Sequence, residues 1–126
     1  MYIIIVGLGG IGRSLTVQSV EHGDNVVIID RNEQRCSDML EHYDVLAITG
    51  NATDKVILED AGIDRADALV ATTSDDSVNL MTCWLAKRFK VTNVVSIVNN
   101  VEHSDLFKEV GVKISENPDE LVASRL

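Results

Sequence analysis

The chain has 126 residues, of which 45 % are hydrophobic and 25 % charged, and its formal net charge is −9. This is enough for one domain with one core, and the apolar content excludes a disordered tail. The acidic charge repels phosphate backbones, which argues against nucleic acid as a partner.

Neither the cysteines nor the N-terminus indicates a secreted or membrane-inserted protein. Cys36 and Cys83 form no CxxC pair and no ligand cluster with the histidines, so we expect free, buried thiols and no metal. The apolar residues 1–6 stop at a glycine, too early for a signal peptide or a membrane span. We therefore expect a cytoplasmic protein that does not insert into the membrane itself.

Short β-branched runs alternate with longer helical patterns along the chain. The strands are predicted at residues 2–6, 25–29, 45–49, 68–71, 94–98 and 112–114. Several runs are continuously apolar, as strands buried on both faces must be, and strand–helix alternation implies a parallel sheet. The pattern predicts one α/β domain over residues 1–126, a Rossmann-like, doubly wound, six-stranded parallel sheet with helices on both faces.

The ends of the helices carry recognisable signals. Gly23, Gly62 and Gly111 each follow a helical stretch and are predicted to take the left-handed conformation that ends a helix. Thr53 and Ser104 are predicted to cap helix starts.

Residues 75–89 are predicted to form a helix that is apolar on more than one side. Val78, Met81, Leu85 and Phe89 share one face at helical spacing, so we expect them to face the core.

Two further segments predict contact with another subunit. Leu80 and Trp84 lie elsewhere around the same helix, although Trp84 at the edge of the core is the alternative. Residues 117–126 start with Asn-Pro-Asp-Glu, a typical helix start, but the helix is too short to be stable alone. We expect at least a dimer, or a domain that continues into a longer protein.

The first predicted strand runs directly into a glycine-rich turn, and a helix opens inside that turn. Its residues are Gly7, Leu8, Gly9, Gly10, Ile11 and Gly12. In this context Gly7 permits the tight turn, Gly9 lets a pyrophosphate approach the backbone, and Gly12 lets the helix pack close to the strand. The helix N-terminus offers unpaired N–H groups to phosphates, which predicts a nucleotide site.

Other residues at the same edge of the sheet extend this site. Asp30 ends the second strand, where a carboxylate accepts hydrogen bonds from ribose hydroxyls and favours NAD over NADP. The neighbouring Arg31 is expected to lie over the adenine or in solvent; the alternative is that it pairs with a 2′-phosphate. Loops after the third and fourth strands are predicted to line the site, although ordinary turn and cap chemistry is the alternative. These loop residues are Asn51, Ala52, Thr72, Thr73, Ser74 and Asp75.

The sequence resembles the N-terminal domain of TrkA-type potassium-transport regulators, also called RCK or KTN domains. The matching stretches are residues 3–13 (IIIVGLGGIGR), 27–30 (VIID), 50–54 (GNATD), 71–76 (ATTSDD) with Asn79-Leu80, and 98–100 (VNN). The resemblance implies a cytoplasmic, non-catalytic domain that binds NAD(H), or else ATP, ADP or AMP. It also implies homodimers that assemble into a larger ring and gate a membrane potassium channel or transporter subunit.

This sequence departs from the family pattern at two positions. The family often has Arg where this chain has Gly10, and commonly has Arg where it has Ile97. Both losses remove charge-assisted contacts to phosphate, and Arg13 is a candidate to replace part of them.

Two enzyme classes are alternatives to the regulatory domain. An NAD-dependent dehydrogenase needs an acid or base close to the nicotinamide, but His22 and His42 lie near helix ends and His103 has no evident partner beyond Glu102. A methyltransferase also uses a glycine-rich turn, but its glycine spacing differs and no catalytic segment is visible. We expect no catalytic residues.

Overall fold

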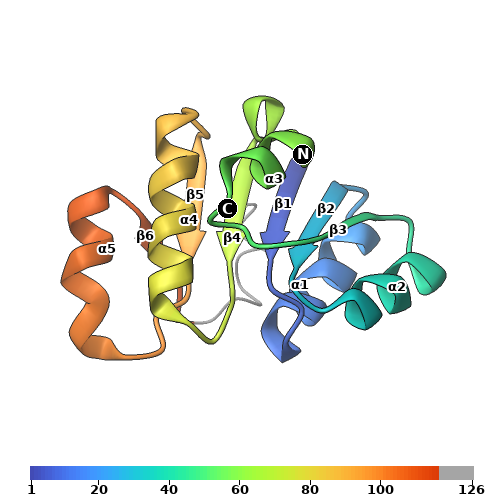
Figure 1. Ribbon diagram of the computed structural model, residues 1–126, viewed down its shortest axis with the longest axis horizontal. Helices are drawn as coiled ribbons and strands as arrows, with labels where there is room; N and C mark the ends of the chain where they lie inside the picture. Colours follow the sequence, from blue (N-terminus) through green and yellow to red (C-terminus); the bar gives the residue numbers. More distant parts are fainter. Residues whose placement is uncertain (117–126) are drawn as a thin grey trace.

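The computed structural model describes residues 1–116 and follows the predicted alternation of strands and helices (Figure 1). The strands are β1 (Tyr2–Val6), β2 (Asn25–Asp30), β3 (Leu46–Thr49), β4 (Ala68–Ala71), β5 (Asn93–Ser96) and β6 (Lys113–Ile114). The α-helices are α1 (Gly10–Glu21), α2 (Glu33–His42), α3 (Lys55–Asp60), α4 (Asp76–Arg88) and α5 (Ser104–Val110). Two short 3₁₀ turns, η1 (Ile63–Arg65) and η2 (Val101–His103), complete the described part.

The six strands form one sheet in the order β3-β2-β1-β4-β5-β6, and all neighbours are parallel. This confirms the doubly wound, Rossmann-like sheet. The chain order reverses between β1 and β4, and in such sheets ligands bind at the carboxyl ends of the strands beside this reversal.

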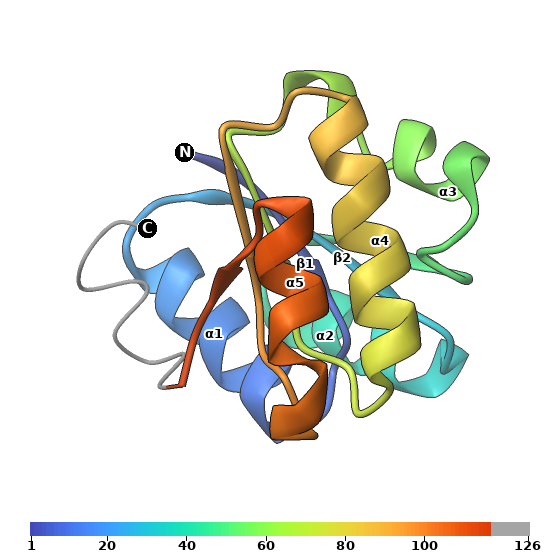
Figure 2. The ribbon, with the colours of Figure 1, turned by 90° about the vertical axis from the view of Figure 1, so that its left-hand side faces the viewer.

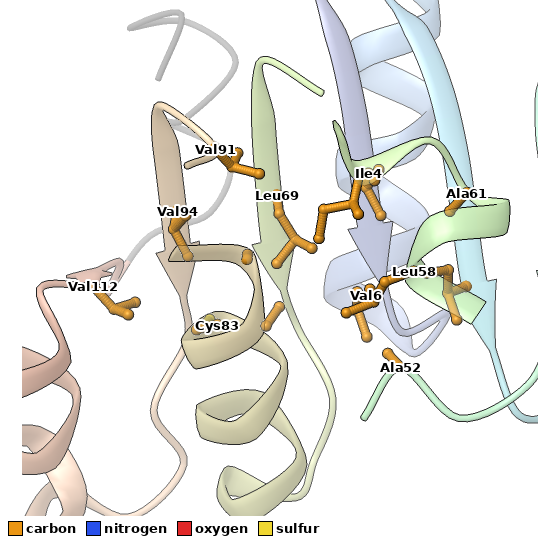
Figure 3. Packing of buried hydrophobic residues seen from close by; sticks show 14 of the residues in the cluster. Ile4, Val6, Ala52, Leu58, Ala61, Leu69, Cys83, Val91, Val94 and Val112 are labelled. Atoms are coloured by element: carbon orange, nitrogen blue, oxygen red, sulfur yellow. The ribbon is translucent and has the colours of Figure 1, made fainter. Parts of the chain in front are cut away.

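Apolar side chains pack on both faces of the sheet, because alternate residues of a strand point to opposite sides. Ile3 and Ile5 of β1 pack in one cluster with α1 and α2. Ile4 of β1 and Leu69 of β4 pack in the other, which takes in Leu58 of α3 (Figure 3). Figure 2 shows α1 and α4 on opposite sides of the sheet. The helices therefore cover both faces, as predicted.

Several local predictions can be compared with the structure. The predicted bounds of β1 and β4 are confirmed to the residue, whereas β2, β3, β5 and β6 differ at their ends by one or two residues. Gly23, Gly62 and Gly111 take the predicted left-handed conformation.

The two predicted helix caps are wrong. The Asp54 carboxylate, not Thr53, caps α3 by accepting a hydrogen bond from Val56 N. Ser104 does not cap α5, because the 3₁₀ turn η2 leads straight into this helix and Asn100 caps that turn instead.

The predicted core face of α4 is confirmed only in part. Leu85 and Phe89 pack against the core while partly exposed, whereas Val78 is only partly buried and Met81 is 50 % exposed. The fully buried face consists of small or polar residues, which let the helix approach the sheet closely: Asn79, Thr82, Cys83 and Ala86. On the outer side, Trp84 is 44 % exposed.

The predicted terminal helix at residues 117–126 lies outside the described residues. Within residues 1–116, no helix combines the length and the apolar character needed to cross a bilayer.

Candidate functional site: a cleft at the strand reversal

A cleft of about 780 Å³ lies at the carboxyl edge of the sheet, where the chain order reverses. It is lined by the glycine-rich turn, the end of β2 and the loops after β3, β4 and β5. Every residue predicted for the site lines this cleft except Gly12, which is buried behind the turn. The structure thus brings together residues from five separate stretches of the chain.

The four glycines of the turn divide into two pairs. Gly7 has a φ of +102°, and a Cβ there would lie 2.9 Å from Thr72 Oγ1. A Cβ on Gly12 would collide with the backbone oxygen of Gly7. Gly9 and Gly10 are different, because a Cβ on either would meet nothing within 4 Å. The first pair is needed to build the turn, and the second leaves open space above it.

The N-terminus of α1 opens into this space. Gly9 is its N-cap residue, and α1 has neither a side-chain cap nor an acidic residue in its first turn. Helix N-termini carry unpaired N–H groups and a partial positive charge, so this end is suited to an anion.

Asp30 is held firmly at the other side of the turn. Its Oδ1 accepts a hydrogen bond from Leu8 N at 2.8 Å, and its Oδ2 accepts one from Asn32 N at 2.8 Å. The carboxylate therefore fastens the glycine-rich turn to the start of α2. Each oxygen can still accept a further hydrogen bond, because a carboxylate offers about four acceptor sites, and Asp30 lines the cleft.

The loops after β3 and β4 line the cleft, as predicted. Their side chains also form ordinary turn and cap hydrogen bonds, which was the alternative role. Asn51 Oδ1 accepts hydrogen bonds from the backbone and hydroxyl of Thr53. The Thr72 hydroxyl is buried and donates to Val6 O, and the Asp75 carboxylate caps α4 by accepting from Ser77 N. The side chains of these loops thus shape the rim of the cleft.

A buried carboxylate that the sequence did not reveal fastens the loop after β5. Asp76 accepts hydrogen bonds from the backbone N–H groups of Asn99 and Asn100 at 2.8 and 2.9 Å, and from the Asn99 side chain at 3.0 Å. Its Oδ2 lies 2.8 Å from His103 Nδ1, so the expectation that His103 has no partner beyond Glu102 is wrong. Since Asn99 lines the cleft, Asp76 helps to set the shape of its rim.

These hydrogen bonds change the acidity of Asp76. Burial alone would raise its pKa, but hydrogen bonds from Asn99, His103 and Asn100 outweigh it and lower the pKa from 3.8 to about 2. A group with a lowered folded-state pKa stabilises the protein above its unfolded pKa, and this stabilisation is lost as the pH falls towards the folded value.

Asp76→Asn is therefore expected to lower the free energy of unfolding at pH 7 by about 2 kcal/mol, the equivalent of this pKa shift. The difference from wild type should shrink as the pH falls from about 4 towards 2, because wild-type Asp76 then becomes protonated. Urea denaturation of the wild type and the variant across this pH range measures the difference in their free energies of unfolding. A difference that stays constant with pH would contradict the assignment.

Sequence reasoning missed several residues that line the cleft. Arg35, in the first turn of α2, is a second arginine that lines the cleft in addition to Arg31. Arg13, expected as a replacement cation, is exposed on α1 and does not line the cleft. The remaining missed lining residues are Val6, Ile29, Asn32, Gly50, Val78 and Asn99.

Reactive groups outside the cleft offer little chemistry. Cys36 and Cys83 are free and buried as predicted, and burial raises the pKa of the Cys83 thiol to about 12. Asp38, Glu41 and His42 of α2 bring candidate metal ligands within 4.8 Å of one another, but exposed acidic groups are common without an ion.

Comparison with known families identifies the type of domain. The sequence matches the TrkA-N domain over residues 3–118. The chain belongs to the TrkA-N domain family. The TrkA-N domain is 34 % identical over all its 126 residues to the Trk system potassium uptake protein TrkA homolog of Methanothermobacter thermautotrophicus, and it spans 58 % of that protein's length.

Solved structures show the same fold for this TrkA-N domain. The GsuK channel bound to NAD matches with a TM-score of 0.81 at 21 % identity, over 91 % of this chain and 21 % of the channel chain. The Kef C-terminal domain of Shewanella denitrificans in its AMP-bound form matches with a TM-score of 0.81 at 23 % identity, over 99 % of this chain and 77 % of the other.

Proposed function

We propose that this TrkA-N domain binds NAD(H) in the cleft and acts as a non-catalytic, cytoplasmic regulatory domain of a membrane potassium channel or transporter. The observation that carries the proposal is the anchored Asp30 carboxylate beside the open Gly9–Gly10 surface. Support for the potassium system comes from the relatives, which are named as Trk potassium uptake proteins. Support for a nucleotide comes from fold neighbours bound to NAD, ADP and AMP.

The lining of the cleft suits each part of the dinucleotide. The pyrophosphate would lie over Gly9 and Gly10 at the N-terminus of α1, and the adenosine ribose would bind Asp30 through its hydroxyl groups. The adenine would lie between Arg31 and the Asn51–Ala52 loop. The same adenosine and phosphate contacts would hold ADP, AMP or ATP.

An oxidoreductase is the second candidate, and the lining of the cleft disfavours it. Among the described residues, no His, Lys, Tyr or Cys lines the cleft. Its ionisable groups are Asp30, Arg31, Arg35 and Asp75, and Asp75 already caps α4. A dehydrogenase needs a positioned acid or base at the reacting carbon, and this cleft offers none beyond that capping carboxylate. Incubation with NADH and candidate carbonyl substrates should therefore show no turnover.

Asp30→Ala is expected to weaken NAD(H) binding by about 1–3 kcal/mol, the scale for losing hydrogen bonds to a charged acceptor. Asp30→Asn should lose less, because the amide oxygen still accepts the Leu8 N–H bond. Isothermal titration calorimetry measures both, with Glu33→Gln, a carboxylate of α2 outside the cleft lining, as the control. Unchanged affinity in Asp30→Ala would mean that the nucleotide binds elsewhere.

The regulatory role also requires assembly, and the outer face of α4 is the surface we assign to it. Met81 and Trp84 are half-exposed there, with the Arg88 guanidinium 4.9 Å from the centre of the Trp84 ring. Leu80, the other residue expected at the contact, packs partly against the domain's own core. We infer a homodimer through this face that forms part of a larger ring beneath the membrane partner.

Trp84→Glu is expected to shift the protein towards monomer without unfolding it. A charge on a solvated face costs little, whereas one buried in an interface costs several kcal/mol. Sedimentation velocity at protein concentrations of tens of micromolar distinguishes a monomer from a dimer. Leu46→Glu is the control, since Leu46 is 63 % exposed on the edge strand β3. A wild-type protein that sediments as a monomer would remove this surface from the proposal.

A further inference from the structure

The charges that line the cleft are distributed unevenly between its two ends. At the β2 end, the lining includes two arginines, Arg31 and Arg35, as well as Asp30. At the far end, formed by the loops after β4 and β5, Asp75 is the only charged lining residue. The sheet order places these ends on opposite sides of β1, and Figure 1 shows α2 and α4 correspondingly far apart.

The rest of the far end is neutral. Ile11, Val78 and Ile97 contribute apolar side chains, and Asn99 contributes an amide whose nitrogen already donates to Thr73 O and Asp76. No lysine or arginine of the described chain lines this end. A group that enters it therefore meets apolar surface and one negative charge.

The carboxylate of Asp75 is held at the N-terminus of α4, at the rim of the cleft. Its Oδ1 accepts hydrogen bonds from Ser77 N at 2.8 Å and Val78 N at 3.3 Å. The Thr73 hydroxyl accepts from Asp75 N at 3.3 Å on the other side. These contacts hold the negative charge at the first turn of α4.

The glycine-rich turn between the two ends offers backbone N–H groups and no cationic side chain. A helix N-terminus supplies only about half a positive charge, so the turn by itself cannot offset the added negative charge of a third phosphate. A third phosphate would extend past the turn into the end that holds Asp75, where like charges repel.

We propose that this charge distribution makes the cleft discriminate against nucleoside triphosphates and in favour of ligands whose phosphate chain ends at the pyrophosphate, such as ADP and NAD(H). The inference rests on the proposed nucleotide site and adds its specificity. Asp75 sets the discrimination, whereas Arg31 and Arg35, at the other end, act on all adenosine nucleotides alike.

Calorimetric titration of the whole chain with ADP, NAD⁺ and ATP tests this, in EDTA so that no divalent cation masks the phosphate charge. ATP is expected to bind roughly tenfold more weakly than ADP. Asp75→Asn keeps a good N-cap residue and removes the charge, so it should bring the ATP affinity close to that for ADP.

Arg35→Gln is the matched variant at the opposite end, and it should weaken all three ligands by the same factor. Wild-type affinity for ATP that equals or exceeds that for ADP would overturn the inference while leaving the nucleotide site intact. An ADP-to-ATP affinity ratio that stays the same in Asp75→Asn as in wild type would also overturn it. Failure of all three ligands to bind would instead reject the proposed function.

Discussion

Gly9→Val is expected to abolish NAD(H) binding, by at least about a hundredfold in affinity, while the domain stays folded. Gly9 has ordinary backbone angles, φ −70° and ψ −171°, and a Cβ there meets nothing within 4 Å, so the fold tolerates a side chain. That side chain would fill the open space above the N-terminus of α1, which the pyrophosphate needs.

Thermal unfolding followed by circular dichroism, together with calorimetric titration, tests both halves of this expectation. Arg13→Val serves as the control, because it places the same side chain on α1 at an exposed position outside the cleft lining. A folded Gly9→Val protein with wild-type affinity would show that the nucleotide does not approach the turn.

Gly12→Ala should have the opposite effect and damage the fold itself. An added Cβ would collide with the backbone oxygen of Gly7 and lie 2.6 Å from Thr72 Oγ1. The Thr72 hydroxyl is tied to Val6 O, so neither neighbour can move aside cheaply. We expect a loss of about 3 kcal/mol in the free energy of unfolding, the upper range for overpacking a close-packed core.

Urea denaturation measures this loss, and Gly9→Ala in the same turn is the matched control, expected near wild-type stability. Gly12→Ala within about 1 kcal/mol of wild type would mean that α1 packs less closely against β1 than the structure indicates. The two substitutions together separate the glycine that leaves room for the ligand from the glycine that leaves room for the helix.

The sequence predicted the parts of the fold that depend on local pattern. Residues 2–6 and 68–71 are continuously apolar and bounded by polar or glycine residues, so both strands were predicted to the residue. The glycine-rich turn and Asp30 follow directly from strand ends, and the edge of a parallel sheet necessarily brings such ends together. Most of the cleft was predictable for this reason.

Features that depend on distant contacts were not predictable. The periodicity of apolar residues in α4 identified only the edge of its buried face, because close packing on the sheet selected small residues such as Cys83 and Ala86 at the centre. The pairing of Asp76 with His103 joins residues that are 27 positions apart. Arg35 reaches the cleft only because α2 begins at its rim.

One nucleotide should bind in the cleft between Asp30 and the glycine-rich turn, and titration of NADH into the nucleotide-free wild-type chain measures this. We expect saturable binding of one NADH per chain, and loss of that binding in folded Gly9→Val protein. Absence of binding by wild type, or equal binding by wild type and Gly9→Val, would contradict it.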